Sequence, residues 1–152
     1  MNDIYMQDHN LDVYILSIHH GSADALYKGI KPHEFRKRFE NYFNPIKVYL
    51  YETIPIGKIT GYIIFDKPII DNPENLINLL EKNKYDTKDK LNNYFLGVNK
   101  AFALPVLKII KFNKEISLEE LKSANVGFLP PMSYIKLNKN IKLNDYLKKK
   151  EI

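Results

Sequence analysis

The stretch whose residue types could bind a ligand or act in catalysis is residues 29–38, GIKPHEFRKR. Its Arg36 and Arg38 are the only arginines among the 23 basic residues of the chain, and Glu34 precedes Arg36 by two positions. A guanidinium is a planar, two-pronged donor that suits a phosphate or the edge of a base. In an extended strand, a two-residue period would place Glu34, Arg36 and Arg38 on one face. The stretch predicts a ligand site, and the alternative is an exposed Glu/Arg ladder on a sheet.

Lys31 and Glu34, in the same stretch, are the candidate catalytic residues. A lysine near a carboxylate can have a shifted pKa and act in catalysis, but a plain ion pair explains the spacing more simply. The imidazoles of His19, His20 and His33 could supply a base or a metal ligand. Neighbouring strand residues point to opposite faces, and no second cluster of histidine and carboxylate has ligand spacing, so we expect no metal. The glycine-rich fingerprints of nucleotide cofactors are also missing, and we expect no cofactor.

Eleven tyrosines and no tryptophan raise the possibility of base stacking on a sheet. Tyr51 and Tyr134 lie on or near predicted strands and are the candidates for such contacts. The alternative is that these rings pack in the core or against neighbouring strands, which is the usual role of aromatic residues in sheets.

Strands and short helices must position these residues. Apolar and β-branched patterns predict strands at residues 11–20, 46–53, 58–66, 100–112 and 132–137. Capping and spacing signals predict helices at residues 23–28, 73–83, 87–95 and 117–120, with a frayed amphipathic helix or a disordered end at 144–150. Gly61 indicates a bulge or the close approach of a neighbour, and Pro105 indicates an edge strand or a bulge.

Composition limits the class of protein. A chain of 152 residues with 45% apolar residues fits one globular domain. No apolar run approaches the roughly 20 residues of a membrane span, no secretory signal is recognisable, and cysteine is absent. We therefore expect a cytoplasmic protein with no membrane partner.

The net charge of +5 is concentrated in two parts of the chain. Residues 28–38 carry five basic residues and one acidic residue, and residues 136–152 carry six basic and two acidic residues. A polyanion would be attracted to either part rather than to the whole surface. The second part is also consistent with a solvated, lysine-rich chain end.

Residues 15–39, ILSIHHGSADALYKGIKPHEFRKRF, resemble the start of ASCH domains, a branch of the PUA-like superfamily. Such domains begin with a strand, a short helix and the pattern G-x-K-x-x-E-x-R, which falls here on Gly29, Lys31, Glu34 and Arg36. Three later blocks resemble the following strand pair, a later strand and the closing Pro-Pro segment of the family. These blocks are VYLYETIPIGKITGYIIF, YFLGVNKAFALPVLKIIKF and FLPPMSYIKL.

The resemblance implies an α+β fold, a PUA-like mixed-strand β-barrel with short flanking helices. It spans residues 11–137, between an N-terminal extension at 1–10 and a lysine-rich C-terminal tail at 138–152. The barrel would open between the motif and the loop at residues 131–133 and hold RNA, a base or a nucleotide. The residues expected to contact this ligand are His19, Lys31, Glu34, Arg36, Arg38, Tyr51, Ser133 and Tyr134.

The chain also departs from the pattern of the family that it resembles. It has His19 and His20 where Lys-Pro is common, and Met132 where glutamine is common. Glu34 stands where the family's amidohydrolases that act on acetylated cytidine have a threonine, which argues against their reaction. The first hypothesis is an RNA- or nucleotide-binding domain with a possible regulatory role. The alternatives are a small hydrolase acting on RNA or a modified nucleoside, and a protein-interaction module.

Overall fold

The structure is a computed structural model that describes residues 10–137 and 139–151. Nearly all of the expected N-terminal extension at 1–10 lies outside the described residues. The elements, in chain order, are β1 (Asp12–Ile18), α1 (His20–Tyr27), β2 (His33–Arg36), β3 (Ile46–Glu52), β4 (Lys58–Phe65), β5 (Ile69–Asp71), α2 (Pro73–Ile77), the 3-10 helix η2 (Asn78–Lys82), α3 (Lys88–Tyr94), β6 (Ala101–Ser117), α4 (Leu118–Ala124), β7 (Tyr134–Lys136) and α5 (Ile141–Lys150).

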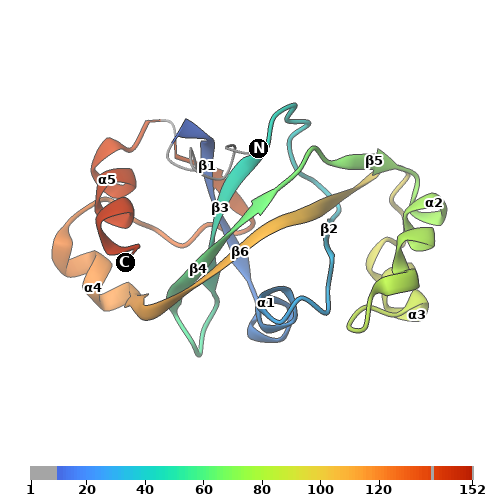
Figure 1. Ribbon diagram of the computed structural model, residues 1–152, viewed down its shortest axis with the longest axis horizontal. Coiled ribbons are helices and arrows are strands. Elements are labelled where there is room, and N and C mark those ends of the chain that lie inside the picture. Colours follow the sequence, from blue (N-terminus) through green and yellow to red (C-terminus); the bar gives the residue numbers. More distant parts are fainter. Residues whose placement is uncertain (1–9, 138, 152) are drawn as a thin grey trace.

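The strands form one mixed sheet that curls into a half-barrel (Figure 1). Their order is β2-β6-β4-β3-β1-β7, with β5 also paired to β6. β1 and β3 run parallel, and the other pairs are antiparallel. Within the described chain, β2 and β7 are the two ends of this order, and the barrel is open between them. The predicted α+β, PUA-like fold with short helices is confirmed.

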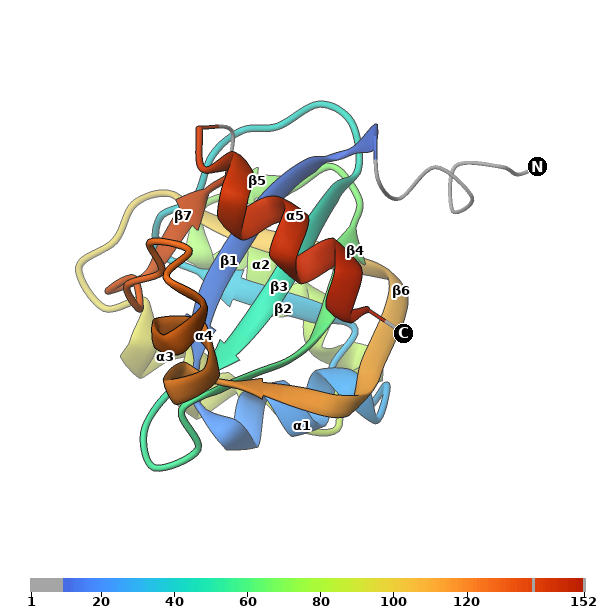
Figure 2. The same cartoon turned by 90° about the vertical axis from the view of Figure 1, so that its left-hand side faces the viewer.

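Alternate residues of the central strands enter two hydrophobic clusters on opposite sides of the sheet. Tyr14 and Leu16 of β1 belong to one cluster, and Ile15 belongs to the other. Helix α5 covers this second cluster and lies across β1, β3 and β4 (Figure 2). The C-terminal segment is therefore a formed helix rather than a frayed or disordered end, because its leucines Leu143 and Leu147 are completely buried.

Strand β6 differs from the sequence expectation, because it is a long inner strand rather than an edge strand. Proline is tolerated at Pro105 because β6 changes partners there. The carbonyl of Pro105 accepts a hydrogen bond from the N–H of Asp66. The N–H of the following residue, Val106, donates to the carbonyl of Pro32. The register with β4 shifts between Ile64 and Phe65, so the alternative of a bulge describes this region better.

Gly61 lies at a second irregularity of the sheet, where the register of β4 against β6 shifts between Ile59 and Gly61. A Cβ atom at this position would lie 2.2 Å from the carbonyl oxygen of Ile110. The predicted bulge and the predicted close approach of a neighbour are both confirmed.

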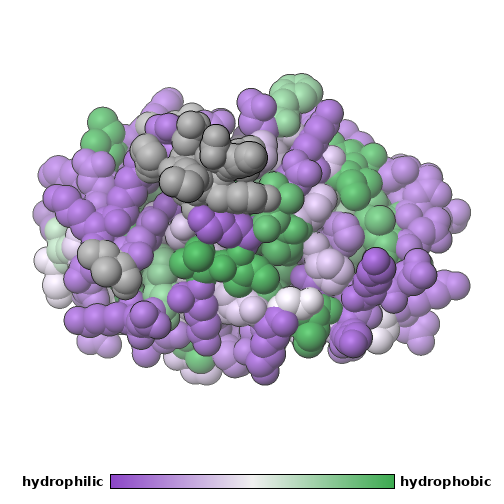
Figure 3. Space-filling model, viewed as in Figure 1, coloured by the Kyte–Doolittle hydropathy of each residue, from purple (hydrophilic) through white to green (hydrophobic). Residues whose placement is uncertain are grey.

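Helices α2, η2 and α3 form an insertion between β5 and β6, at the opposite end of the molecule from α4 and α5 (Figure 1). Asn72 and Thr87 cap α2 and α3 with their side chains. The apolar side of the insertion packs around Phe35 of β2. Both ends of the face seen in Figure 3 are largely hydrophilic. None of the described helices is long and apolar enough to span a bilayer.

Candidate functional site

A pocket of 310 Å³ lies beside β2, between the start of α1 and the helical insertion. Lys31 enters it from the connection that precedes β2, whereas Glu34 and Arg36 enter it from β2 itself. Phe35, between them on β2, packs in the cluster under the insertion and borders the pocket from that side. Packing of this one phenylalanine therefore fixes which way Glu34 and Arg36 face.

The polar side chains form a connected, largely buried network. Lys31 Nζ lies 2.8 Å from Glu34 Oε1 and donates to Ser22 Oγ at 2.5 Å. Arg36 donates through Nη1 to Glu34 Oε2 at 3.1 Å and through Nη2 to Ser133 Oγ at 3.0 Å. Glu34 is only 3% exposed and Lys31 5%, which excludes an exposed Glu/Arg ladder.

The contact between Arg36 and Ser133 also bridges the opening of the barrel. Arg36 ends β2, and Ser133 directly precedes β7, so the hydrogen bond joins the two ends of the strand order. Ser17 holds the loop from the β1 side, donating from its N–H to Ser133 C=O at 2.9 Å and from its hydroxyl to Pro131 C=O at 2.6 Å.

Neighbouring charges keep both Lys31 and Glu34 ionised. Burial alone would raise the pKa of Glu34, but the charges of Lys31 and Arg36 outweigh it and hold this pKa below its usual value. Burial alone would lower the pKa of Lys31, but the carboxylates of Glu34 and Asp86 outweigh it and raise this pKa. A protonated lysine has no lone pair with which to deprotonate Ser22, and an ionised, doubly paired carboxylate is a weak base. The network is better suited to binding than to proton transfer.

Two of the other candidate residues lie at or beside the pocket. His19 lines it and caps α1, where its Nδ1 accepts from Ser22 N–H at 3.3 Å. Arg38 lines a neighbouring hollow instead, because β2 ends at Arg36 and the two-residue period stops there. The expected common face of Glu34, Arg36 and Arg38 was therefore wrong beyond Arg36. Phe39 consequently packs in a different cluster from Phe35.

The two candidate tyrosines pack in the hydrophobic clusters and do not line the pocket. Tyr134 lies against Phe39, with the ring centroids 4.4 Å apart. Tyr51 is 2% exposed and packs near Phe128 in the cluster beneath α5. Their geometry matches the packing alternative described for strand aromatics.

Several residues that line the pocket were not among the sequence candidates, and Ser22, Tyr85 and Asp86 are among them. Ser22 was recognised only as a possible helix cap, yet its hydroxyl accepts from Lys31. Asp86 Oδ2 lies 3.8 Å from Lys31 Nζ and is supplied by the insertion. Its loop reaches the pocket through a tertiary hydrogen bond from Lys84 N–H to Ile30 C=O, and no local pattern signals such a contact.

The described residues contain no group of three or more histidine, cysteine, aspartate or glutamate side chains that could hold a metal ion.

Comparison with known proteins identifies similar chains. No family model matches the sequence. An ASCH domain-containing ribonuclease from Zymomonas mobilis subsp. mobilis is 25% identical over 125 residues, which make up 82% of this chain and 84% of that protein. The crystal structure of ASCH from Zymomonas mobilis matches with a TM-score of 0.78 at 22% identity, covering 90% of this chain and 94% of the other.

A more distant match is the N-terminal domain of McrB from Staphylothermus marinus, with a TM-score of 0.55 at 8% identity. It covers 90% of this chain and 93% of that domain. The half-barrel is therefore shared well beyond recognisable sequence similarity. The chain is therefore similar to ASCH domain proteins in sequence over most of its length, and it shares their fold.

Proposed function

We propose that this protein is an RNA-binding domain that holds one base or nucleotide of its ligand in the pocket of Lys31, Glu34 and Arg36. The observation that carries the proposal is the buried network of these three side chains, which fixes donors and an acceptor at one concave place. The similarity to a protein named as a ribonuclease supports RNA as the ligand class.

The mixture of hydrogen-bonding groups favours a base over a bare phosphate. Arg36 and Lys31 can only donate, whereas the ionised Glu34 can only accept. A phosphate offers acceptors alone and would be repelled by Glu34, but the edge of a base offers donors beside acceptors. The pocket volume of 310 Å³ lies at the lower end of the range of about 300–1,000 Å³ for small-ligand sites, which suits a single nucleotide unit.

Arg36 is expected to be the residue whose loss weakens binding most directly. Arg36→Ala should reduce RNA affinity by roughly 1–3 kcal/mol, the cost of a lost charge-assisted contact. Arg36→Lys should be nearly as harmful, because an ammonium cannot reproduce the two-pronged contact to Glu34 and Ser133. Fluorescence anisotropy with labelled RNA measures both variants.

The matched control is Lys122→Ala, which removes an exposed cation from α4, at the other end of the molecule (Figure 1). It should leave RNA affinity within a factor of two. Unchanged affinity in Arg36→Ala, with the variant folded, would contradict the assignment of the pocket.

RNA cleavage at the same pocket is the second candidate function, and the name of the Zymomonas relative favours it. Lys31 and Arg36 could stabilise negative charge at a phosphate. However, no residue of the network is poised to take a proton, because the pKa of Lys31 is raised and that of Glu34 is lowered. We therefore expect RNA and acetylated nucleosides to be recovered intact, with or without divalent metal, as measured by electrophoresis and mass spectrometry.

Contamination by other nucleases is controlled with Lys31→Met, purified in the same way. Product that forms with the wild-type protein and is lost with folded Lys31→Met would establish the enzyme in place of the binding domain.

A further inference from the structure

A second hollow, of 800 Å³, adjoins the pocket and is called here the basic groove. Its lining includes Arg36, Lys37, Arg38, Tyr94, Lys100 and Phe102. Arg36 and Tyr94 line both the pocket and the groove, so the two hollows adjoin at these side chains.

The two hollows differ in charge. The charged lining of the pocket has both signs: the cations of Lys31, Arg36 and Lys90 lie with the carboxylates of Glu34 and Asp86. Among the described residues that line the groove, four are basic and none is acidic. A concave surface with one sign of charge concentrates the opposite charge, and the repeated phosphates of a nucleic acid strand supply it.

We propose that the basic groove binds the sugar-phosphate backbone of the nucleotides next to the one in the pocket. The ligand is then a single-stranded RNA of several nucleotides rather than a free nucleoside or nucleotide. This inference rests on the proposed function and adds the path of the strand to it. One base enters the pocket, where carboxylates lie beside cations, and the neighbouring phosphates lie along Lys37, Arg38 and Lys100.

The side chains at the boundary between the pocket and the groove are of types that bind a single strand. Arg36 reaches both sides, with Nη1 on Glu34 in the pocket and Nη2 on Ser133 in the groove. Tyr94 stands at the same boundary with its ring partly exposed, and Lys37 Nζ lies 4.8 Å from the ring centroid. An aromatic ring beside a cation is the combination that unpaired bases and their phosphates use on proteins that bind single strands.

A duplex fits this arrangement poorly. A base can enter a pocket of this size only when it leaves its stack, which costs little in a single strand.

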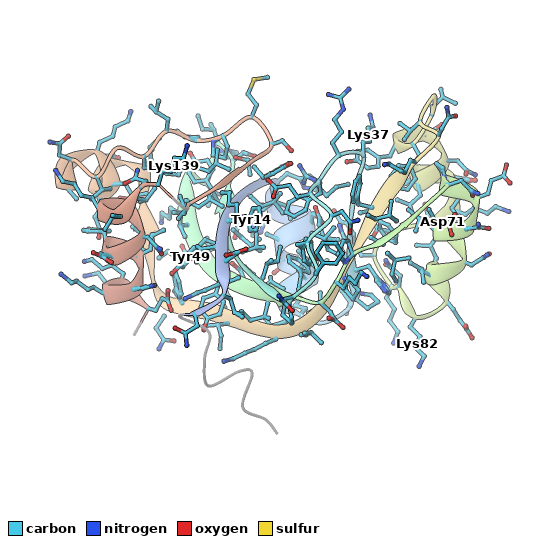
Figure 4. All side chains as sticks on the ribbon, turned by 90° about the horizontal axis from the view of Figure 1, so that it is seen from above. Tyr14, Lys37, Tyr49, Asp71, Lys82 and Lys139 are labelled. Carbon is cyan, nitrogen blue, oxygen red and sulfur yellow. The ribbon has the colours of Figure 1, made fainter. Side chains whose placement is uncertain are left out.

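The lysines of the C-terminal part supply charge elsewhere: Lys139 lies beside α5, well separated from Lys37 (Figure 4). They provide a control with the same change of net charge.

The test compares two triple variants, Lys37→Gln/Arg38→Gln/Lys100→Gln in the groove and Lys139→Gln/Lys142→Gln/Lys149→Gln as the control. Binding of labelled RNA of one, three, six and nine nucleotides is measured by anisotropy between 50 and 200 mM salt. For the wild type, affinity should rise with length beyond one nucleotide. The groove variant should bind the nine-mer at least about 10-fold more weakly, with a salt slope smaller by about 2, since each single-strand phosphate contact contributes about 0.7.

Binding of the mononucleotide should be unchanged in the groove variant, because the pocket is left intact. The control variant should keep nine-mer affinity within a factor of two and most of the salt slope. Equal effects of the two triple variants, or a nine-mer bound no more tightly than a mononucleotide, would contradict the proposed role of the groove. Neither result would contradict the proposed role of the pocket. If the wild-type protein binds none of these RNAs, the proposed function itself is wrong.

Two further ligands test the chemistry of the strand. A DNA nine-mer bound as tightly as the RNA nine-mer would overturn RNA as the specific ligand. A duplex RNA bound more tightly than the single strand would overturn the single-stranded path. We expect both to bind more weakly than single-stranded RNA.

Discussion

Glu34→Gln is expected to lower the free energy of unfolding by about 3 kcal/mol, near the lower limit for breaking a buried ion pair. The substitution preserves shape but leaves the buried ammonium of Lys31 without its carboxylate partner at 2.8 Å. Asp86, at 3.8 Å, compensates only in part. Urea denaturation at pH 7 measures the effect as a lower midpoint with an unchanged slope.

The control for this variant is Glu115→Gln. Glu115 pairs with Lys58 at 3.7 Å, and the two side chains are 33% and 45% exposed to solvent. Removing such a surface pair should cost less than about 1 kcal/mol. Equal destabilisation by the two substitutions would show that the network around Lys31 does not stabilise the fold.

The pH dependence of the same variant follows from the depressed pKa of Glu34. A group whose pKa is lower in the folded state stabilises the fold above its unfolded pKa, and this stabilisation is lost as the pH falls through the folded value. The stability difference between wild type and Glu34→Gln should therefore be full at pH 7 and shrink below about pH 4.5. At the alkaline end, the raised pKa of Lys31 keeps its contribution present until the pH rises through that value.

The expected loss of stability affects how functional assays of Glu34→Gln are interpreted. A change of RNA preference or of turnover in Glu34→Gln can be interpreted only when the folded fraction is measured in the same buffer. The ionised state of the network across neutral pH also means that RNA binding at the pocket should vary little between pH 6 and 8.

Local patterns were sufficient to predict much of the fold. The alternation at residues 46–53 and 58–66 gave β3 and β4, since each strand forms with a two-residue period regardless of its partners. Thr87 and Ser117 gave the starts of α3 and α4, because a cap depends on hydrogen bonds within three residues. The open side of the half-barrel followed from the family resemblance.

Parts of the site depend on tertiary contacts and could not be derived in this way. The extent of β2 is set by its pairing with β6, so the sequence alone did not show that the two-residue period ends at Arg36. Asp86 belongs to the helical insertion and follows Glu34 by more than 50 residues in the chain. Its position beside Lys31 depends on how that insertion packs on Phe35. Tyr51 was selected by residue type, but the side of the sheet on which a ring lies is decided by register.

Leu147→Ala in α5 is expected to destabilise the protein by about 3 kcal/mol, within the range of roughly 2–5 kcal/mol for a buried leucine cut back to alanine. The side chain of Leu147 extends from α5 into the cluster that also contains Ile15 and Tyr49, and it is fully buried there. Thermal and urea denaturation measure the loss. Lys142→Ala, which changes the same helix at an exposed position, should alter stability by less than about 0.5 kcal/mol.

Removal of all residues after Leu137 should be more damaging still. It would uncover the second hydrophobic cluster and take away Glu151, whose carboxylate lies 2.7 Å from the buried Nζ of Lys47. The truncated chain should therefore lose its cooperative unfolding transition. For this reason the charge of the C-terminal lysines has to be tested by substitution and not by truncation. A truncated protein that unfolds cooperatively at the wild-type midpoint would show that residues 138–152 are a dispensable tail, as their lysine-rich composition alone had indicated.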